Sequence, residues 1–107
     1  MTVTPTEAQF QQAIVDLAEL CGWRTMHVRR STVRDQQWAT VTSITGWPDL
    51  TIWRPGRLLM VELKSANGRL TPEQRDVLAS LTAAGIDARC WRPADWPEIE
   101  TTLTTNH

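Results

Sequence analysis

Asp49, Glu62 and Lys64 are the residues whose types and spacing could do chemistry. Two carboxylates, with a backbone carbonyl nearby, are the hard oxygen ligands that Mg²⁺ prefers, and a lysine beside them can offset negative charge. A purely structural alternative stays open. Asp49 could cap a turn after Pro48, with Glu62 and Lys64 as solvated residues at the end of a strand.

A predicted β-hairpin would bring these residues together. Residues 50–53 and 58–63 are rich in Leu, Ile, Val and Trp, and Pro55-Gly56 between them supplies the residue types of a tight turn. Whether the loop contains two residues or four, the pairing of the strands is the same. That pairing places Asp49 directly opposite Glu62.

The second strand of this hairpin has two different faces, because side chains alternate along a strand. Leu59, Val61 and Leu63 share the face expected to pack on the core, and Glu62 and Lys64 share the other. Carboxylates opposed at about 5 Å repel by about 3 kcal/mol at an effective dielectric near 20. A partly buried pair therefore needs compensation from a lysine or a bound cation.

The ordered set of these residues resembles the PD-(D/E)xK nuclease superfamily and, more narrowly, the VRR-NUC (virus-type replication-repair nuclease) family. The matching residues are Gly46, Pro48, Asp49, Glu62, Lys64, Thr71 and Gln74. With Glu7 in a predicted N-terminal helix, the resemblance covers most of the chain.

The resemblance implies an α/β protein with a restriction-endonuclease-like core, in which a mixed β-sheet with a central hairpin is flanked by α-helices. It also implies a Mg²⁺-dependent DNA endonuclease, with Mn²⁺ as a substitute ion. Asp49, Glu62, the Leu63 carbonyl and Glu7 would hold the metal ion. Lys64 would position or help to deprotonate the attacking water, and Gln74 would orient the lysine or the water.

The predicted helices have capping signals that offer other roles for two of these residues. Thr4 is expected to cap the first helix, with Pro5 at its first position and Glu7 closing a capping box. Thr71 and Gln74 repeat this pattern in a later helix. Glu7 and Gln74 also lie on the inward faces of their helices, so a capping role and a role in the site both stay open.

Apolar residues at helical spacing extend these two helices to Gly22 and Gly85, which end them. The run of the first helix is Phe10, Ala13, Ile14, Leu17, Leu20 and Cys21, and that of the later helix is Val77, Leu78, Leu81 and Ala84.

The remaining pattern predicts one domain over residues 1–103 and a frayed tail over 104–107. Residues 23–28 are expected to form the first strand and residues 87–91 the last. The last strand should run parallel to the second hairpin strand, because a helix connects the two. A short final helix is expected to end near Leu103.

Net charge is −1, so any DNA contact must come from local patches. Arg24, Arg29, Arg30 and Arg34 form a basic segment suited to phosphate contact, with a solvated loop as the alternative. Residues 31–45 are harder to assign. Trp38 within them could stack on a base, fill a subunit interface or be buried in the core.

The expected substrate is branched DNA, because a small chain has little surface for reading a base sequence. A homodimer that cleaves four-way (Holliday) junctions fits best, since two active sites on a twofold axis suit a twofold junction. The alternatives are flap- or nick-directed cleavage, a non-catalytic DNA-binding subunit and a metal-binding regulatory protein.

The absence of a signal peptide and of a transmembrane segment predicts a cytoplasmic protein without membrane contact. Cys21 and Cys90 are expected to be unpaired core thiols.

Overall fold

The computed structural model describes residues 4–28 and 44–105. The elements in chain order are helix α1 (Glu7–Leu20), strands β1 (Arg24–His27), β2 (Leu50–Arg54) and β3 (Arg57–Leu63), helix α2 (Pro72–Ala83), strand β4 (Asp87–Trp91), a short 3-10 helix η1 (Pro93–Asp95) and helix α3 (Trp96–Thr104). None of the helices within these ranges is both long enough and apolar enough to cross a bilayer.

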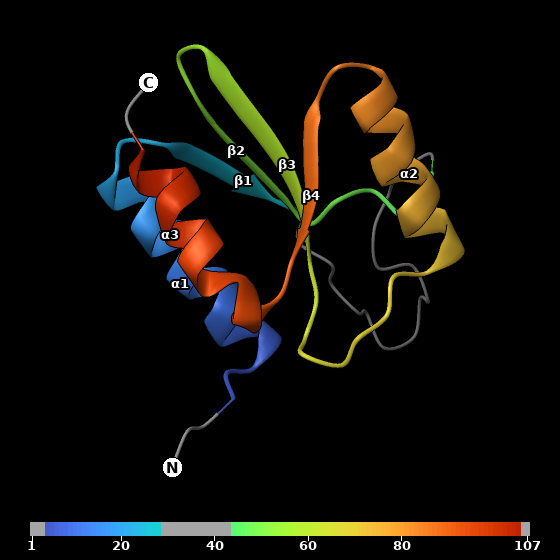
Figure 1. The fold of residues 1–107 in the computed structure, drawn as a ribbon, viewed down its shortest axis with the longest axis horizontal. Coiled ribbons are helices and arrows are strands. Elements are labelled where there is room, and N and C mark those ends of the chain that lie inside the picture. Colours follow the sequence, from blue (N-terminus) through green and yellow to red (C-terminus); the bar gives the residue numbers. More distant parts are fainter. Residues whose placement is uncertain (1–3, 29–43, 106–107) are drawn as a thin grey trace, which may run out of the picture.

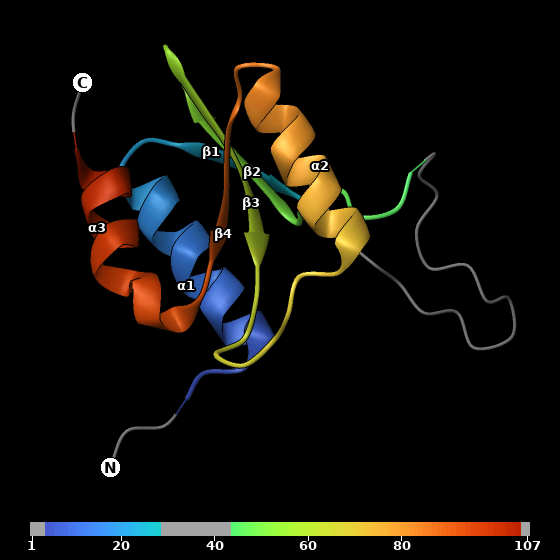
Figure 2. The same cartoon turned by 45° about the vertical axis from the view of Figure 1, so that its right-hand side comes forward.

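The four strands form one mixed sheet in the order β1-β2-β3-β4. β1, β2 and β3 are antiparallel neighbours, whereas β3 and β4 are parallel. Helices α1 and α3 cover one face of the sheet and α2 lies on the other (Figures 1 and 2). The predicted mixed sheet flanked by helices, with a parallel last strand, is confirmed.

The central hairpin has the predicted register. Leu50 pairs with Val61 and Trp53 with Leu58, and the ladder continues to Arg54 opposite Arg57. The loop is therefore the two-residue Pro55-Gly56 turn. Gly56 has a φ of 82°, the left-handed conformation that a glycine adopts without a steric cost.

The core lies between the sheet and the α1/α3 layer. Leu59, Val61 and Leu63 point into it as predicted, and Phe10 and Ile14 of α1 pack against the same cluster. The opposite face of β3 is not open, contrary to the prediction that only one face is buried. Met60 is 8% exposed and Glu62 only 2% exposed. The helix on that side of the sheet explains the difference, since its Gln74 contacts Glu62.

The start of α1 differs from the prediction. The cap is Thr6 instead of Thr4, because the Thr6 hydroxyl accepts a hydrogen bond from the Gln9 backbone and the Gln9 side chain accepts one from the Thr6 backbone. Gln9 thus takes the place predicted for Glu7 in the capping box. Glu7 becomes the first residue of the helix, and its side chain is exposed.

The predicted apolar stripes are only partly buried. Leu20 is 84% exposed, because the buried stripe of α1 advances through Phe10, Ile14 and Ala18 and at about 3.6 residues per turn Leu20 faces away from it. In α2, Gln74 is the one buried residue, and the apolar side chains of that helix are half-buried or exposed. Both helices nevertheless end as predicted, before Gly22 and Gly85, whose φ angles are positive.

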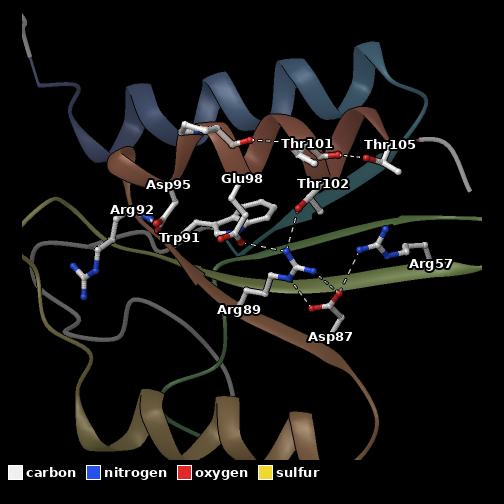
Figure 3. A network of polar contacts seen from close by, with 11 residues as sticks. Arg57, Asp87, Arg89, Trp91, Arg92, Asp95, Glu98, Thr101, Thr102 and Thr105 are labelled. Atoms are coloured by element: carbon white, nitrogen blue, oxygen red, sulfur yellow. Dashed lines mark hydrogen bonds and ion pairs between the residues drawn. The ribbon is translucent and has the colours of Figure 1, made fainter.

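A polar network joins β4 to α3 on the core side of the sheet (Figure 3). Arg89 donates to both carboxylate oxygens of Asp87 at 2.7 and 3.0 Å, and it also contacts Glu98 and Thr102 of α3. The hydrogen bond from Arg89 holds the pKa of the Asp87 carboxyl below its ordinary value, and the same pair raises the pKa of Arg89. This network positions the strand that ends beside the candidate site.

Two smaller predictions concern the chain end and the cysteines. The final helix continues to Thr104, one residue into the segment predicted to be a frayed tail. Cys21 and Cys90 are unpaired as predicted, although both are half-buried instead of fully enclosed. Burial raises the pKa of the Cys90 thiol.

Candidate active site

The predicted acidic residues come together where β2 begins and β3 ends. Asp49 immediately precedes Leu50, Glu62 immediately follows Val61, and those two apolar residues are paired in the ladder. The Asp49 carboxylate accepts a hydrogen bond of 3.1 Å from the Leu63 backbone N–H. The two acidic residues thus adjoin the last pair of the ladder, which has the predicted register.

The segment that leads into Asp49 is fixed against the first turn of α2. Gly46 has a φ of 95°, and a Cβ at this position would lie 2.7 Å from the Glu73 carbonyl carbon and 2.8 Å from the Gln74 nitrogen. Pro48 is fully buried. Only glycine satisfies both the backbone angle and the close approach, so Gly46 sets the position of Asp49 relative to α2.

Glu62 is a buried carboxylate with polar partners from two directions. Gln74 Nε2 donates to Glu62 Oε2 at 3.0 Å, and Lys64 Nζ lies 3.9 Å from the same oxygen. Burying a charge costs free energy unless it is hydrogen-bonded or paired. The amide of Gln74 and the ammonium of Lys64 supply this compensation, which makes the residues around Glu62 one connected unit.

Gln74 closes the predicted capping box and also contacts the candidate site. Its side-chain oxygen accepts from the Thr71 backbone at 3.0 Å and closes the capping box of α2, while its amide nitrogen reaches Glu62. It is 7% exposed, which confirms its predicted inward orientation. In the structure it contacts Glu62 and not Lys64.

Lys64 stands where β3 leaves the sheet. Its backbone N–H donates to the Trp91 carbonyl at 3.0 Å, and its side chain is 16% exposed. The aliphatic stem passes close to Gly68, where an added Cβ would lie 3.5 Å from Lys64 Cδ. The ammonium is therefore held near Glu62 while part of it still reaches solvent.

Glu7 lies near Asp49, in a hollow whose lining does not include Glu62 or Lys64. This hollow of about 400 Å³ is lined by Asp49 and Leu63 and, from α1, by Glu7. Within residues 4–28 and 44–105, however, no group of three His, Cys, Asp or Glu side chains is arranged to hold a metal ion. A ligand role for Glu7 stays a prediction.

The donor atoms at this end of the hairpin suit a hard divalent cation. Two carboxylates and a backbone carbonyl are all oxygen ligands, and Mg²⁺ is commonly held by one or two carboxylates together with water and substrate phosphates. Asp49, Glu62 and the Leu63 carbonyl fit this requirement without a third acidic side chain.

Of the predicted DNA-binding arginines, Arg24 is the one within the described residues, and it lies away from this site. Arg24 pairs with Trp53 near the hairpin turn, at the opposite end of the sheet from Asp49, and its guanidinium lies 5.4 Å from the centre of the Trp53 ring. Arg29, Arg30 and Arg34 lie outside the residues that the structure describes, as do Trp38 and most of the segment 31–45.

Sequence reasoning missed Arg92, which follows β4 and stands beside Lys64. Leu63 pairs with Trp91 in the parallel ladder, so the next residues of the two strands are neighbours. The missing information was the register of β4. A long crossover through a helix fixes no register, whereas the short hairpin turn does.

A comparison with protein families matches residues 6–94 of the chain to the VRR-NUC domain. The match includes the hairpin, both capping boxes and the end of β4. No curated protein matches the chain.

Proposed function

Because the chain belongs to the VRR-NUC family, a family of nucleases of the PD-(D/E)xK type, we propose that it is a Mg²⁺-dependent, structure-selective DNA endonuclease that cleaves four-way junctions or other branched DNA. The observation that carries this proposal is the buried Glu62, which Gln74 and Lys64 contact at the end of the hairpin where Asp49 also lies. A carboxylate that is buried from solvent beside a lysine is more typical of a reacting centre than of a solvated strand end.

Asp49, Glu62 and the Leu63 carbonyl would hold the metal ion, with Glu7 as a further ligand. When bound, a divalent cation supplies a Lewis acid that makes water more acidic and neutralises phosphate charge. Mn²⁺ would substitute for Mg²⁺ in this all-oxygen set.

Lys64 would act on the attacking water and on the charge of the scissile phosphate. In the reaction, a water oxygen forms a bond to phosphorus as one backbone phosphorus–oxygen bond breaks. The water gives up a proton to solvent, and the departing sugar oxygen takes one up from solvent. An ammonium near this oxygen would position the water and offset the negative charge that develops on the phosphate. Gln74 would hold Glu62 in place through the 3.0 Å hydrogen bond.

The substrate part of the proposal rests on size and symmetry. One chain of 107 residues offers little surface for reading a base sequence, so the shape of branched DNA is the better recognition signal. Two copies related by a twofold axis would present two active sites to a junction of the same symmetry. Arg24, Arg29, Arg30 and Arg34 would add phosphate contacts.

The proposal is tested by incubating the protein with end-labelled four-way junction, flap and plain duplex DNA, with Mg²⁺, Mn²⁺ or EDTA. We expect paired symmetric cuts in the junction that need the metal ion, and a homodimer by light scattering under the same conditions. Cuts confined to the flap would replace the junction by a different branched substrate. Failure to cut any substrate with either metal ion would contradict the endonuclease proposal and favour a DNA-binding subunit.

A further inference from the structure

Charge is distributed unevenly between the two layers of helices. α1 and α3 contain no lysine or arginine, and their acidic residues are Glu7, Asp16, Glu19, Glu98 and Glu100. The lysines and arginines in the described part of the chain lie on the strands, on α2 or in the segments that join the elements, and the side chains of Arg54 and Arg89 contact the α1/α3 side. The acidic outer surfaces of α1 and α3 therefore disfavour a polyanion, and the side of the sheet that carries Lys64 is the better approach to the site.

On that side, Arg92 occupies the position beside Lys64 at the carboxyl ends of two parallel strands. Leu63 and Trp91 are paired, and the Lys64 backbone donates to the Trp91 carbonyl at 3.0 Å. Neighbouring strands lie about 4.8 Å apart. A guanidinium rooted here stands one strand away from the candidate catalytic lysine.

The Arg92 side chain is held in place by neutral acceptors. Its Nη1 donates to the carbonyl of Ser65 at 2.8 Å and to that of Gly68, both in the turn that follows β3. Among the residues that the structure describes, no carboxylate forms an ion pair with this guanidinium. Its charge and its Nε and Nη2 donors thus remain available to an anion from outside.

Arg89 shows the opposite arrangement three positions earlier in the chain, and the contrast is visible in Figure 3. Arg89 is paired with Asp87 and Glu98 in the network under α3. The Arg92 side chain is directed away from that network. Arg69, which directly follows Gly68, is exposed and adds a second positive charge to the same turn.

We propose that Arg92 and Arg69 form a phosphate-binding surface for the DNA backbone next to the scissile phosphate. A guanidinium already oriented by two carbonyls loses little further freedom when it binds phosphate, and its planar donors match phosphate oxygens. The proposal rests on the proposed function in taking DNA as the ligand and Lys64 as part of the active site. It adds the turn after β3 to the phosphate contacts proposed for the basic segment.

The test measures binding of a fluorescein-labelled duplex by anisotropy in EDTA, over a range of KCl concentrations. Each lost phosphate contact should lower the slope of log Kd against log salt by about 0.9. We expect this loss for Arg69→Gln and for Arg92→Gln. The double variant should lose about twice as much. Arg92→Lys keeps the charge, so its slope should stay close to that of the unaltered protein.

Arg57→Gln is the matched control, because it removes the same charge from the other end of β3. Arg57 precedes Lys64 by seven residues, roughly 23 Å at about 3.3 Å per residue of strand. Its slope should equal that of the unaltered protein. Circular dichroism checks that the Arg92 variants are folded. Because the Arg69 side chain is exposed, Arg69→Gln should fold normally, so it tests the proposal even if an Arg92 variant does not fold.

An unchanged slope in the Arg69→Gln/Arg92→Gln double variant would overturn the proposal. The outcome is separable from that of the proposed function because no cleavage is measured. Reduced slopes in a protein that cuts no DNA would contradict only the nuclease activity, whereas cleavage with unchanged slopes would contradict only this surface.

Discussion

At the scale of single residues, the amide of Gln74 couples the start of α2 to the candidate active site. It closes a capping box through Oε1 and donates to the buried Glu62 through Nε2. The chain contains a second capping box of the same composition, Thr6 with Gln9, whose glutamine is exposed and, among the described residues, forms no hydrogen bond beyond the capping contact. This repeat offers an internal control for the contact with Glu62.

Gln74→Ala should destabilise the protein more than Gln9→Ala does. Loss of the capping contact alone should cost a few tenths to about 1 kcal/mol, and removing the Gln74 hydrogen bond from a buried carboxylate should add about 1–3 kcal/mol. Urea denaturation of both variants measures the difference. Equal losses of unfolding free energy would show that Gln74 is only a helix cap.

The second prediction at this scale concerns Asp87 and pH. Because Arg89 lowers the pKa of this carboxyl from its ordinary value of 3.8, the pair contributes stability above that pH and loses it as pH falls through the lower folded-state pKa. Asp87→Asn should therefore be less stable than the unaltered protein at pH 7, and the gap should narrow below about pH 4. Urea denaturation at pH 7, 5 and 3 follows the gap. A gap that stays constant over this range would contradict the assignment.

At the scale of elements, the site depends on how closely the segment before Asp49 approaches α2. Gly46 and Gly56 both have positive φ angles, but a Cβ would meet the α2 backbone at Gly46 and nothing within 4 Å at Gly56. The two glycines therefore separate the cost of the backbone angle from the cost of the contact.

Gly56→Ala should cost about 1–2 kcal/mol from the backbone angle alone. Gly46→Ala should cost about 1–3 kcal/mol more, because a contact of 2.7 Å forces α2 away from the hairpin. It should also lower cleavage, since Gln74 moves with the helix. Thermal unfolding and cleavage rates of the two variants test this. Equal destabilisation by the two substitutions would show that α2 shifts away from residue 46 with no loss of stability, which would contradict the prediction.

The central hairpin was predictable from sequence, whereas much of its surroundings was not. A two-residue Pro55-Gly56 turn fixes which residues face each other, so the opposition of Asp49 and Glu62 followed from counting. The burial of Glu62 did not, because it depends on where α2 packs. The cap of α1 was misplaced since Thr4 and Thr6 both carry suitable hydroxyls, and only the structure distinguishes Gln9 from Glu7 as the partner.

At the scale of the whole molecule, the two helical layers have different roles. The acidic α1/α3 layer closes the core, and α2 supplies the Gln74 contact to Glu62. The ends of β3 and β4 bring Lys64 and Arg92 side by side between these layers. DNA bound at this edge would meet Lys64 and the metal ligands together.

The measurement that tests the central claim most directly compares DNA cleavage and DNA binding in Lys64→Ala. Catalysis by a positioned charge or acid–base group is commonly worth about 10²–10⁴ in rate, so we expect a loss of that size in the Mg²⁺-dependent cleavage rate. Binding of the same junction in EDTA should stay within about threefold of the unaltered protein, because one charge contributes little to a surface of many phosphate contacts. A parallel and equal loss of binding and cleavage would contradict the account and make Lys64 a DNA-binding residue instead of a catalytic one.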